Sequence, residues 1–480
     1  MKRISLFFGM LLCLLLCSAP VHAAEEPTIT VAIASFDSDS YDYSKIEQEL
    51  DKYVYEKLGF HVNMEYLEYI SYGQEMNTYL LQGQFPDVYL IIDDSDYNML
   101  LQNGYLFPLD DLLDKYGKDL SAVCSEQELL SHTEADGFCY GIPCIHGRGW
   151  TIGFEYRVSI AEKYGLDMEN IHTVEDLGEV FAVLKEKNPD IVPLGWTTYC
   201  AWDMLPDTLG VLMNMGHSDK IENLYETEEY ENLCLLFSEW REKGYMLNTD
   251  YVQTDFSSYV QLEDTFGKLA DYNPAMQWTD AIEGGEEFNC IPLSQNTIMS
   301  NAYNRNCWVI SSETEYPRYA MEFLNLLYTD KTLPNLLAYG THGNDYEFTD
   351  SNCDEIRLFA LDNASLEKPI KIRNYLVGNQ YLCYRLEGFP EDIWDQAVMY
   401  DQNALISNGY GFEFDDTPVS RQVQTCQKIV DLYDPLLMYG TPDAKEVLAS
   451  FREELKEAGI GHIIAEKQKQ FNEWKAKEKS

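Results

Sequence analysis

The first hundred residues after the N-terminal segment alternate between short apolar runs and stretches with helical spacing. Strand candidates are residues 28–34, 61–66 and 88–92, and helix candidates between them are residues 46–58 and 72–81. Strands that alternate with helices in this order favour parallel pairing, with helices on both faces of the sheet. We therefore expect an α/β lobe at the start of the chain.

The same alternation begins again near residue 147, which predicts a second lobe. Thr173 and Asp176 have the spacing of a capping box, in which the two residues at a helix start satisfy each other's backbone N–H groups. Further strands are predicted at residues 150–156 and 307–310, and further helices at residues 158–164, from Pro317 onward, and at residues 444–458 and 462–474. The whole chain is thus predicted to be α/β, with a helical C-terminal end.

Length and composition narrow the class of protein. A chain of 480 residues corresponds to about three domains at ~150 residues each, and 45% hydrophobic residues suffice for globular cores. The 34 basic and 81 acidic side chains give a net charge of −47, which repels nucleic acids and anionic membrane surfaces. We expect no nucleic-acid partner.

The N-terminus predicts export. Two basic residues precede an apolar run from Ile4 to Cys17, and small residues then precede a cut before Ala24, so residues 1–23 have the features of a secretory signal peptide. The run is shorter than the roughly 20 residues that span a bilayer. Lipid attachment at Cys17 is the alternative, although Leu16 stands where a lipoprotein signal favours a small residue.

Ten cysteines follow the predicted signal peptide, and an even number in an exported chain permits disulfides. Cys139 and Cys144 are the closest pair and the first to test, whereas buried free thiols are the alternative.

Several fragments, in order along the chain, resemble one protein family. They are GQFPDV at 83–88, GYLFPLDDL at 104–112, YGIP at 140–143, the capping-box helix at Thr173, and WVIS with YPRYAMEFL within 308–324. They resemble the family 1 extracellular solute-binding proteins, the receptors of bacterial carbohydrate ABC importers. YGTHGNDY at 339–346 and LKEAGI at 455–460 resemble a long Gram-positive subfamily with an extended C-terminal region.

The resemblance implies a two-lobed periplasmic-binding-protein-like fold of type II, each lobe a mostly parallel sheet flanked by helices, with a hinge between them. The expected division is residues 24–146 with about 295–345 in lobe one, and residues 147–294 with about 346–480 in lobe two. Ligand would be held in the cleft between the lobes, because open sheets bind ligands beyond the carboxyl ends of their strands. Gly147 and Gly149 are interpreted as flexible hinge positions.

Sugar rings present apolar faces and hydroxyl rims, so a sugar receptor needs flat aromatic rings and short polar side chains. Side chains of these types stand at predicted strand ends, loops and crossovers. The candidate ligand-binding residues are Phe36, Asp37, Asp94, Arg148, Trp150, Trp196, Tyr199, Trp202, Trp278, Tyr303 and Tyr346. A core or rim position is the alternative for each aromatic residue, and a solvated loop for the aspartates.

The sequence predicts no metal site, cofactor or catalytic residue. The histidines lack metal-binding spacing, and no Gly-x-Ser-x-Gly motif occurs. The resemblance implies a monomeric, non-enzymatic receptor that passes an oligosaccharide to ABC permease subunits at the cell surface. The alternatives are a secreted glycoside hydrolase, since two carboxylates suffice for that reaction, and the same fold acting on peptides or as a sensor.

Overall fold

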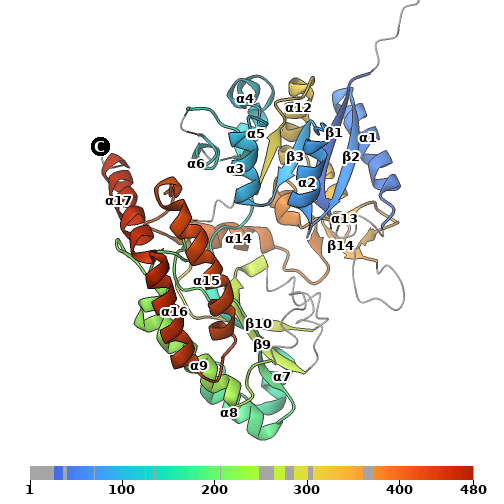
Figure 1. Ribbon diagram of the computed structural model, residues 1–480. Helices are drawn as coiled ribbons and strands as arrows, with labels where there is room; N and C mark the ends of the chain where they lie inside the picture. The colour runs from blue at the N-terminus through green and yellow to red at the C-terminus, as the bar shows by residue number, and fades with distance from the viewer. Residues whose placement is uncertain are drawn as a thin grey trace, which may run out of the picture.

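The computed structural model describes residues 26–35, 41–69, 71–124, 126–134, 136–205, 207–247, 264–275, 286–300, 306–359 and 371–478, except the side chains of residues 94, 95, 126, 127 and 478. The described chain forms two lobes, each with its own hydrophobic core (Figure 1). No described helix is long and apolar enough to cross a membrane.

The sheet of the first lobe has the strand order β2-β1-β3-β12-β4. Its strands are β1 (Thr28–Ser35), β2 (His61–Glu68), β3 (Val88–Ile91), β4 (Ile142–Pro143) and β12 (Cys307–Ile310). β1 is parallel to both β2 and β3, whereas β12 is antiparallel to β3 and β4. The strand that returns from the second lobe therefore enters a parallel sheet in the opposite direction.

Amphipathic helices cover this sheet. They are α1 (Ser44–Leu58), α2 (Tyr72–Leu81), α3 (Asp94–Gln102), α4 (Asp110–Tyr116), α5 (Lys118–Val123), α6 (Glu126–Leu130), α12 (Pro317–Thr329) and α13 (Thr332–Tyr339). α1 buries Ile46, Leu50 and Val54 along one face and ends at Gly59, whose positive φ of 78° suits glycine. α12 begins at Pro317, where a missing N–H costs no helical hydrogen bond.

The sheet of the second lobe has the order β10-β5-β9-β6, and it corrects one expectation. Its strands are β5 (Thr151–Arg157), β6 (Val192–Thr197), β9 (Thr265–Tyr272) and β10 (Phe288–Pro292). Only β6 and β9 are parallel; β5 is antiparallel to β9 and to β10. A mostly parallel sheet was expected here, and this detail was wrong because an apolar run indicates burial but not the direction of the neighbouring strand.

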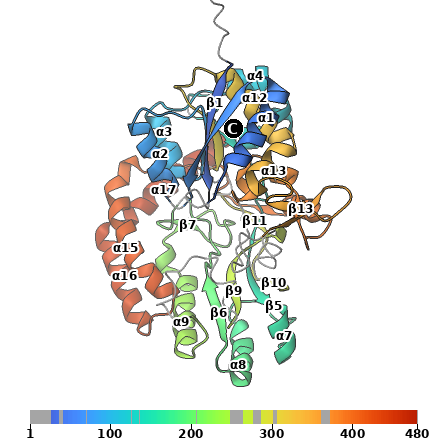
Figure 2. The same cartoon turned by 90° about the vertical axis from the view of Figure 1, so that its right-hand side faces the viewer.

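Two groups of helices pack against the second sheet and its loops. α7 (Val158–Tyr164), α8 (Leu177–Lys187) and α9 (Glu228–Glu242) follow its strands, and α15 (Ser420–Met438), α16 (Ala444–Ala458) and α17 (Ile460–Glu478) close the chain. Figures 1 and 2 both show α15, α16 and α17 together along one side of this lobe. The capping box is confirmed: Asp176 Oδ2 accepts the N–H of Thr173, and Thr173 Oγ1 accepts the N–H of Asp176.

Short elements complete the structure. They are β7 (Val211–Leu212), β8 (Ile221–Glu222), β11 (Thr297–Ile298), β13 (Tyr346–Phe348), β14 (Glu355–Leu358), β15 (Arg385–Leu386), α14 (Ile393–Gln402), β16 (Leu405–Ile406), and 3-10 turns at Leu224–Glu226, Asn374–Leu376, Gln380–Leu382 and Thr417–Val419.

The buried residues show where the chain passes between the lobes. Core residues up to 145 and from 307 to 393 belong to the first lobe, and those from 152 to 299 and from 419 to 463 belong to the second. The described chain therefore crosses three times. The described residues 346–359 and 371–393 pack in the first lobe, which differs from the expected boundary because apolar side chains of β13, β14 and β15 belong to the same hydrophobic core as those of α12 and α13.

All ten cysteines after residue 23 lie within the described part of the chain, and none forms a disulfide. Cys139 and Cys144 each donate to a backbone carbonyl instead, that of Gly141 for Cys139 and that of Leu376 for Cys144.

Candidate functional site

The three crossing segments are joined to one another between the lobes. Trp150, in the first crossing, exchanges two backbone hydrogen bonds with Thr297 in β11. β11 in turn pairs in parallel with β16 of the third crossing, where Leu405 donates its N–H to the carbonyl of Asn296. The crossings thus form a small hydrogen-bonded ribbon.

A single carboxylate fastens the first crossing to the third. Asp401, near the end of α14, accepts the backbone N–H groups of Arg148 and Gly149 at 2.9 and 2.7 Å. Burial raises the pKa of Asp401, although these two amides oppose the shift. A Cβ atom on Gly149 would lie 2.7 Å from Asn296 Oδ1, so this glycine provides space for a close approach.

The Arg148 side chain forms an ion pair with Glu128 of α6, in the first lobe. Glu128 is 4% exposed. The arginine was predicted to contact ligand; the structure shows its guanidinium engaged with a buried carboxylate beside the hinge. The crossing segment is therefore bound by its backbone to α14 and by its side chain to α6.

Trp196, Tyr199 and Trp202, which were predicted to fall in one loop of the second lobe, occur at the end of β6 and in the segment that follows it. Trp196 is in β6, and Tyr199 follows in the loop, with its ring edge-on to that of Trp202 at a centroid distance of 6.1 Å. Trp196 and Tyr199 are partly exposed, whereas Trp202 is buried in the core. This loop leaves the carboxyl end of a strand, the edge of an open α/β sheet where ligands bind.

Helix α15 of the C-terminal segment adds side chains to this group. The ring of Tyr439, directly after α15, lies 6.4 Å from that of Trp196. The hydroxyl of Tyr230 in α9 donates to Oδ1 of Asp434 in α15 at 2.5 Å, and the Tyr230 ring lies 6.4 Å from that of Trp202. Tyr439 with Trp196, and Asp434 with Tyr230, thus bring together residues more than 200 positions apart in the sequence.

The other sequence-predicted residues lie elsewhere or outside the described part. Tyr346 is in β13 of the first lobe, packed against His342, Phe348 and Tyr384. Asp94 begins α3, and its side chain is not described. Phe36, Asp37, Trp278 and Tyr303 lie outside the described residues.

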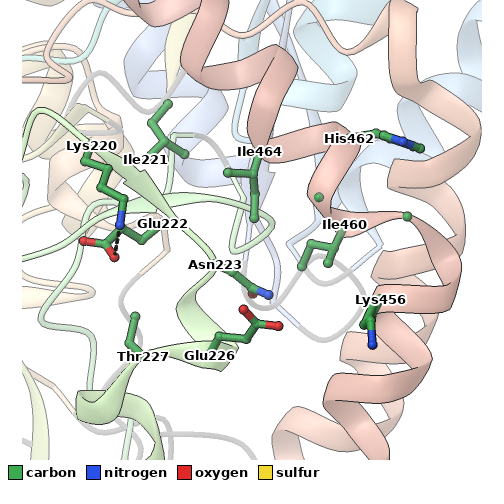
Figure 3. Close-up of a pocket in the computed structure, with 12 residues that line it drawn as sticks. Lys220, Ile221, Glu222, Asn223, Glu226, Thr227, Lys456, Ile460, His462 and Ile464 are labelled. Carbon is green, nitrogen blue, oxygen red and sulfur yellow. Dashed lines mark hydrogen bonds and ion pairs between the residues drawn. The ribbon is translucent and has the colours of Figure 1, made fainter.

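Two surface hollows lie away from the aromatic group. One, of about 520 Å³, lies between the segment around β8 and the junction of α16 and α17, with Asn223, Glu226 and Ile460 among its lining residues (Figure 3). Lys220 and Glu222 form an ion pair at its edge. The other, of about 350 Å³, lies between α1 and α13 and is lined in part by Tyr346. None of Trp150, Trp196, Tyr199 and Trp202 lines either hollow.

Sequence reasoning missed Asp401, Glu128 and Asp434. All three are acidic residues on helices, in a chain with 81 acidic side chains, so no local pattern distinguishes them. Only Asp434 has a local irregularity beside it, because Pro435 lies inside α15.

Two lobes, three joined crossings and an aromatic strand end define a hinged solute-binding protein. The profile of the bacterial extracellular solute-binding protein family matches residues 37–332, and a domain of unknown function (DUF3502) matches residues 408–476. The chain belongs to the bacterial extracellular solute-binding protein family, which agrees with the resemblance noted from the sequence, and the fold class is confirmed.

Known relatives agree in fold and length. A carbohydrate ABC transporter substrate-binding protein of Streptococcus pneumoniae is 25% identical over 441 residues, covering 88% of this chain and 86% of the relative. The crystal structure of the N-glycan transport solute-binding protein of the same species has a TM-score of 0.82 at 22% identity, covering 93% of this chain and 99% of that one. FusA of S. pneumoniae in complex with kestose has a TM-score of 0.65 at 17% identity, covering 94% and 100%.

Proposed function

We propose that this protein is the extracytoplasmic substrate-binding component of a carbohydrate ABC importer. It captures a neutral oligosaccharide between its two lobes and delivers it to the transmembrane permease subunits without chemical change. The observation that carries the proposal is the aromatic group at the carboxyl end of β6, in a hinged member of the solute-binding family.

The partly exposed rings of Trp196 and Tyr199 suit the apolar faces of sugar rings, because flat aromatic surfaces with polar edges combine packing with directed hydrogen bonds. The relatives support the ligand class. A related S. pneumoniae structure contains Man1GlcNAc, another contains Man5GlcNAc, and FusA contains kestose.

The hinge supports the mechanism. Asp401 joins the first and third crossings, and β11 pairs with both. The two lobes can move about such a ribbon. A ligand that touches both lobes then stabilises the closed state by the difference between its affinities for the closed and the open state. The permease would then distinguish the loaded receptor by its closed shape.

The cellular setting is part of the proposal. Residues 1–23 act as a signal peptide, Cys17 is the candidate lipid-attachment site, and the mature protein works as a monomer at the surface of a Gram-positive cell. The family match supports an exported protein.

Titration calorimetry of the mature protein tests the function. Kestose, maltotriose, Man1GlcNAc and Man5GlcNAc are titrated separately, beside a mixture of short peptides. We expect heat from at least one neutral sugar and a melting temperature that rises with its concentration. Heat from peptides alone would refute the sugar assignment, and reducing ends released from a bound sugar would favour the glycoside hydrolase.

A further inference from the structure

The hollow of about 350 Å³ between α1 and α13 belongs to the first lobe alone. Figures 1 and 2 both show these two helices side by side. α1 contributes Tyr53 and four charged side chains to the lining, and the segment from α13 to β13 contributes two threonines, Leu336, His342 and Tyr346. No residue of the second lobe lines the hollow, so it is separate from the aromatic residues at the end of β6.

Aromatic rings form one wall of this hollow. Between ring centroids, His342 lies 5.8 Å from Tyr346 and 5.0 Å from Phe348. Behind them, the Tyr384 ring lies 5.9 Å from that of Tyr346 and 5.2 Å from that of Phe348. Tyr346 is buried, whereas Tyr53 is partly exposed and His342 is exposed. The His342 ring therefore rests on a packed aromatic base that holds it in place and leaves it accessible.

Polar groups that are free to bind a ligand surround these rings. In the part of the chain that the structure describes, the ring nitrogens of His342 and the hydroxyl of Thr332 have no hydrogen-bond partner. Lys45 and Glu56 form no ion pair with a described residue, and the other two charged residues of the lining pair with each other at 3.8 Å. Two lysines and two glutamates thus balance here, in a chain with 81 acidic and 34 basic side chains. The hollow therefore offers donors and acceptors without a net charge from these four side chains.

A sugar ring matches this lining, because it presents an apolar face inside a rim of hydroxyls. The volume is within the range of about 300–1,000 Å³ that small-molecule pockets have. The net charge of −47 repels anions, and the balanced lining gives a cation no excess of carboxylates.

We propose that this hollow is a second carbohydrate site, which holds one neutral sugar ring within the first lobe. The ring of His342 packs on the apolar face of the sugar, and Thr332, Lys45 and Glu56 bond to its hydroxyls. Tyr346, which was predicted from the sequence as a ligand contact, is part of the aromatic wall. The inference goes beyond the proposed function, because a site built within one lobe binds sugar whether the lobes are open or closed.

Histidine NMR of the mature protein tests the site. The protein is labelled with ¹³C at the histidine Cε1 atoms, and the signals of His342 and His172 are assigned by their loss in His342→Ala and His172→Ala. The probes are the methyl glycosides of glucose, galactose, mannose and N-acetylglucosamine, with methyl glucuronide and a short peptide as the acidic and the non-sugar probe. Each is titrated into the free protein, and again after the tightest-binding oligosaccharide from the calorimetry has just saturated the protein.

We expect at least one neutral glycoside to shift the His342 signal in both titrations. The dissociation constant should be on the order of 1 mM, because a single sugar ring has few atoms with which to bind. The signal of His172, an exposed histidine of the second lobe, should not move. Methyl glucuronide should bind more weakly than the neutral glycoside, since the chain repels anions.

Two tyrosine variants of α1 locate the binding. Tyr53→Leu removes a ring from the lining and should weaken the binding that His342 reports by at least about threefold. Tyr55→Leu, at an exposed tyrosine that does not line the hollow, is the matched control and should leave the binding unchanged. The hydroxyl of Tyr53 also bonds to Asp330 at 2.9 Å, so the melting temperature of each variant is measured to show that it is folded.

Three results would overturn the second site: no shift of the His342 signal with any neutral glycoside, equal weakening in both tyrosine variants, or loss of the shift once the oligosaccharide is bound. A shift caused only by the peptide or by methyl glucuronide would overturn the assignment to neutral sugars. The proposed function is tested separately. If no oligosaccharide binds tightly but His342 still responds to a neutral glycoside, the proposed function fails and this site stands.

Discussion

Asp401 Oδ1 accepts the backbone N–H of Gly149 at 2.7 Å, which joins the last turn of α14 to the first crossing between the lobes. The neighbouring N–H of Arg148 donates to the same carboxylate. One side chain therefore holds two of the three crossings in register. Any change in the angle between the lobes must be absorbed close to this contact.

Gly149 and Gly147 provide a matched test of how tightly the hinge is packed. Gly149→Ala would place a Cβ atom 2.7 Å from Asn296 Oδ1 and 3.2 Å from Asp401 Oδ1, whereas a Cβ atom on Gly147 would lie 3.9 Å from Asp401 Oδ1. We expect Gly149→Ala to lower the free energy of unfolding by about 1–3 kcal/mol and Gly147→Ala to change it by less than about 0.5 kcal/mol. Urea titration monitored by tryptophan fluorescence measures both, and equal effects would show that Gly149 is not closely packed.

Asp203 is a buried acceptor for the second and third crossings. Its carboxylate, 1% exposed, accepts the N–H of Ser300 at 2.9 Å and also bonds to the hydroxyl of Ser407. Asp203→Asn should lower the free energy of unfolding by about 3 kcal/mol, because the amide cannot accept these donors equally well. Asp219→Asn, at an exposed carboxylate of the same lobe, is the control and should cost under about 1 kcal/mol. Similar midpoints for both variants would contradict this role.

Lys467 and Asp207 should respond unequally to substitution. Lys467 of α17 is fully buried and pairs with Asp207 at 2.8 Å, and burial lowers the pKa of Lys467. Asp207→Asn leaves a buried cation without its partner and should cost about 3 kcal/mol, whereas Lys467→Met removes that cation and should cost clearly less. The comparison is made from urea midpoints at pH 7. A larger loss of stability in Lys467→Met than in Asp207→Asn would show that the stabilisation from the ion pair exceeds the cost of burying the cation without its partner.

His61 should make the first lobe slightly less stable at alkaline pH. Its ring nitrogens lie 2.9 Å from Asp51 Oδ1 and 3.0 Å from Glu26 Oε2, and hydrogen bonding to Asp51 and then to Glu26 raises the pKa of His61. The folded pKa therefore exceeds the unfolded value of about 6.5. The protonated ring stabilises the fold below that pH, and the contribution is lost as pH rises through the folded pKa.

His61→Asn should therefore reduce the difference between urea midpoints at pH 5.5 and pH 8.5. The effect should be small, because the side chain is 36% exposed and solvent weakens its ion pairs. If the urea midpoint of His61→Asn depends on pH as that of the wild type does, other titratable groups cause the pH dependence of stability.

Much of the fold could be predicted because burial leaves a local periodic signal. The expected helices at 72–81, 158–164 and 444–458 match α2, α7 and α16, and the expected strand at 307–310 matches β12. The direction of β5 and β10, and the packing of residues 346–359 and 371–393 in the first lobe, depend on contacts between distant segments. Local periodicity carries no information about those contacts.

Less of the candidate site could be predicted. Trp196, Tyr199 and Trp202 were predicted as ligand contacts because they fall in a Gly/Thr loop. The structure places Trp196 in β6 and sets only the Tyr199 and Trp202 rings against each other. Asp434 could not be found from the sequence, because its contact with Tyr230 spans 204 positions and depends on the packing of α15 on α9. Trp202 was expected at the ligand surface, yet its ring is buried, since a loop position does not reveal which aromatic side chain turns inward.

The central claim is tested most directly by native mass spectrometry of the mature protein incubated with Man5GlcNAc, kestose and a short peptide in equal amounts. The account predicts a monomer carrying one intact neutral oligosaccharide, which is released with unchanged mass when the protein unfolds. A spectrum with only peptide bound, or with a shortened sugar released, would contradict it.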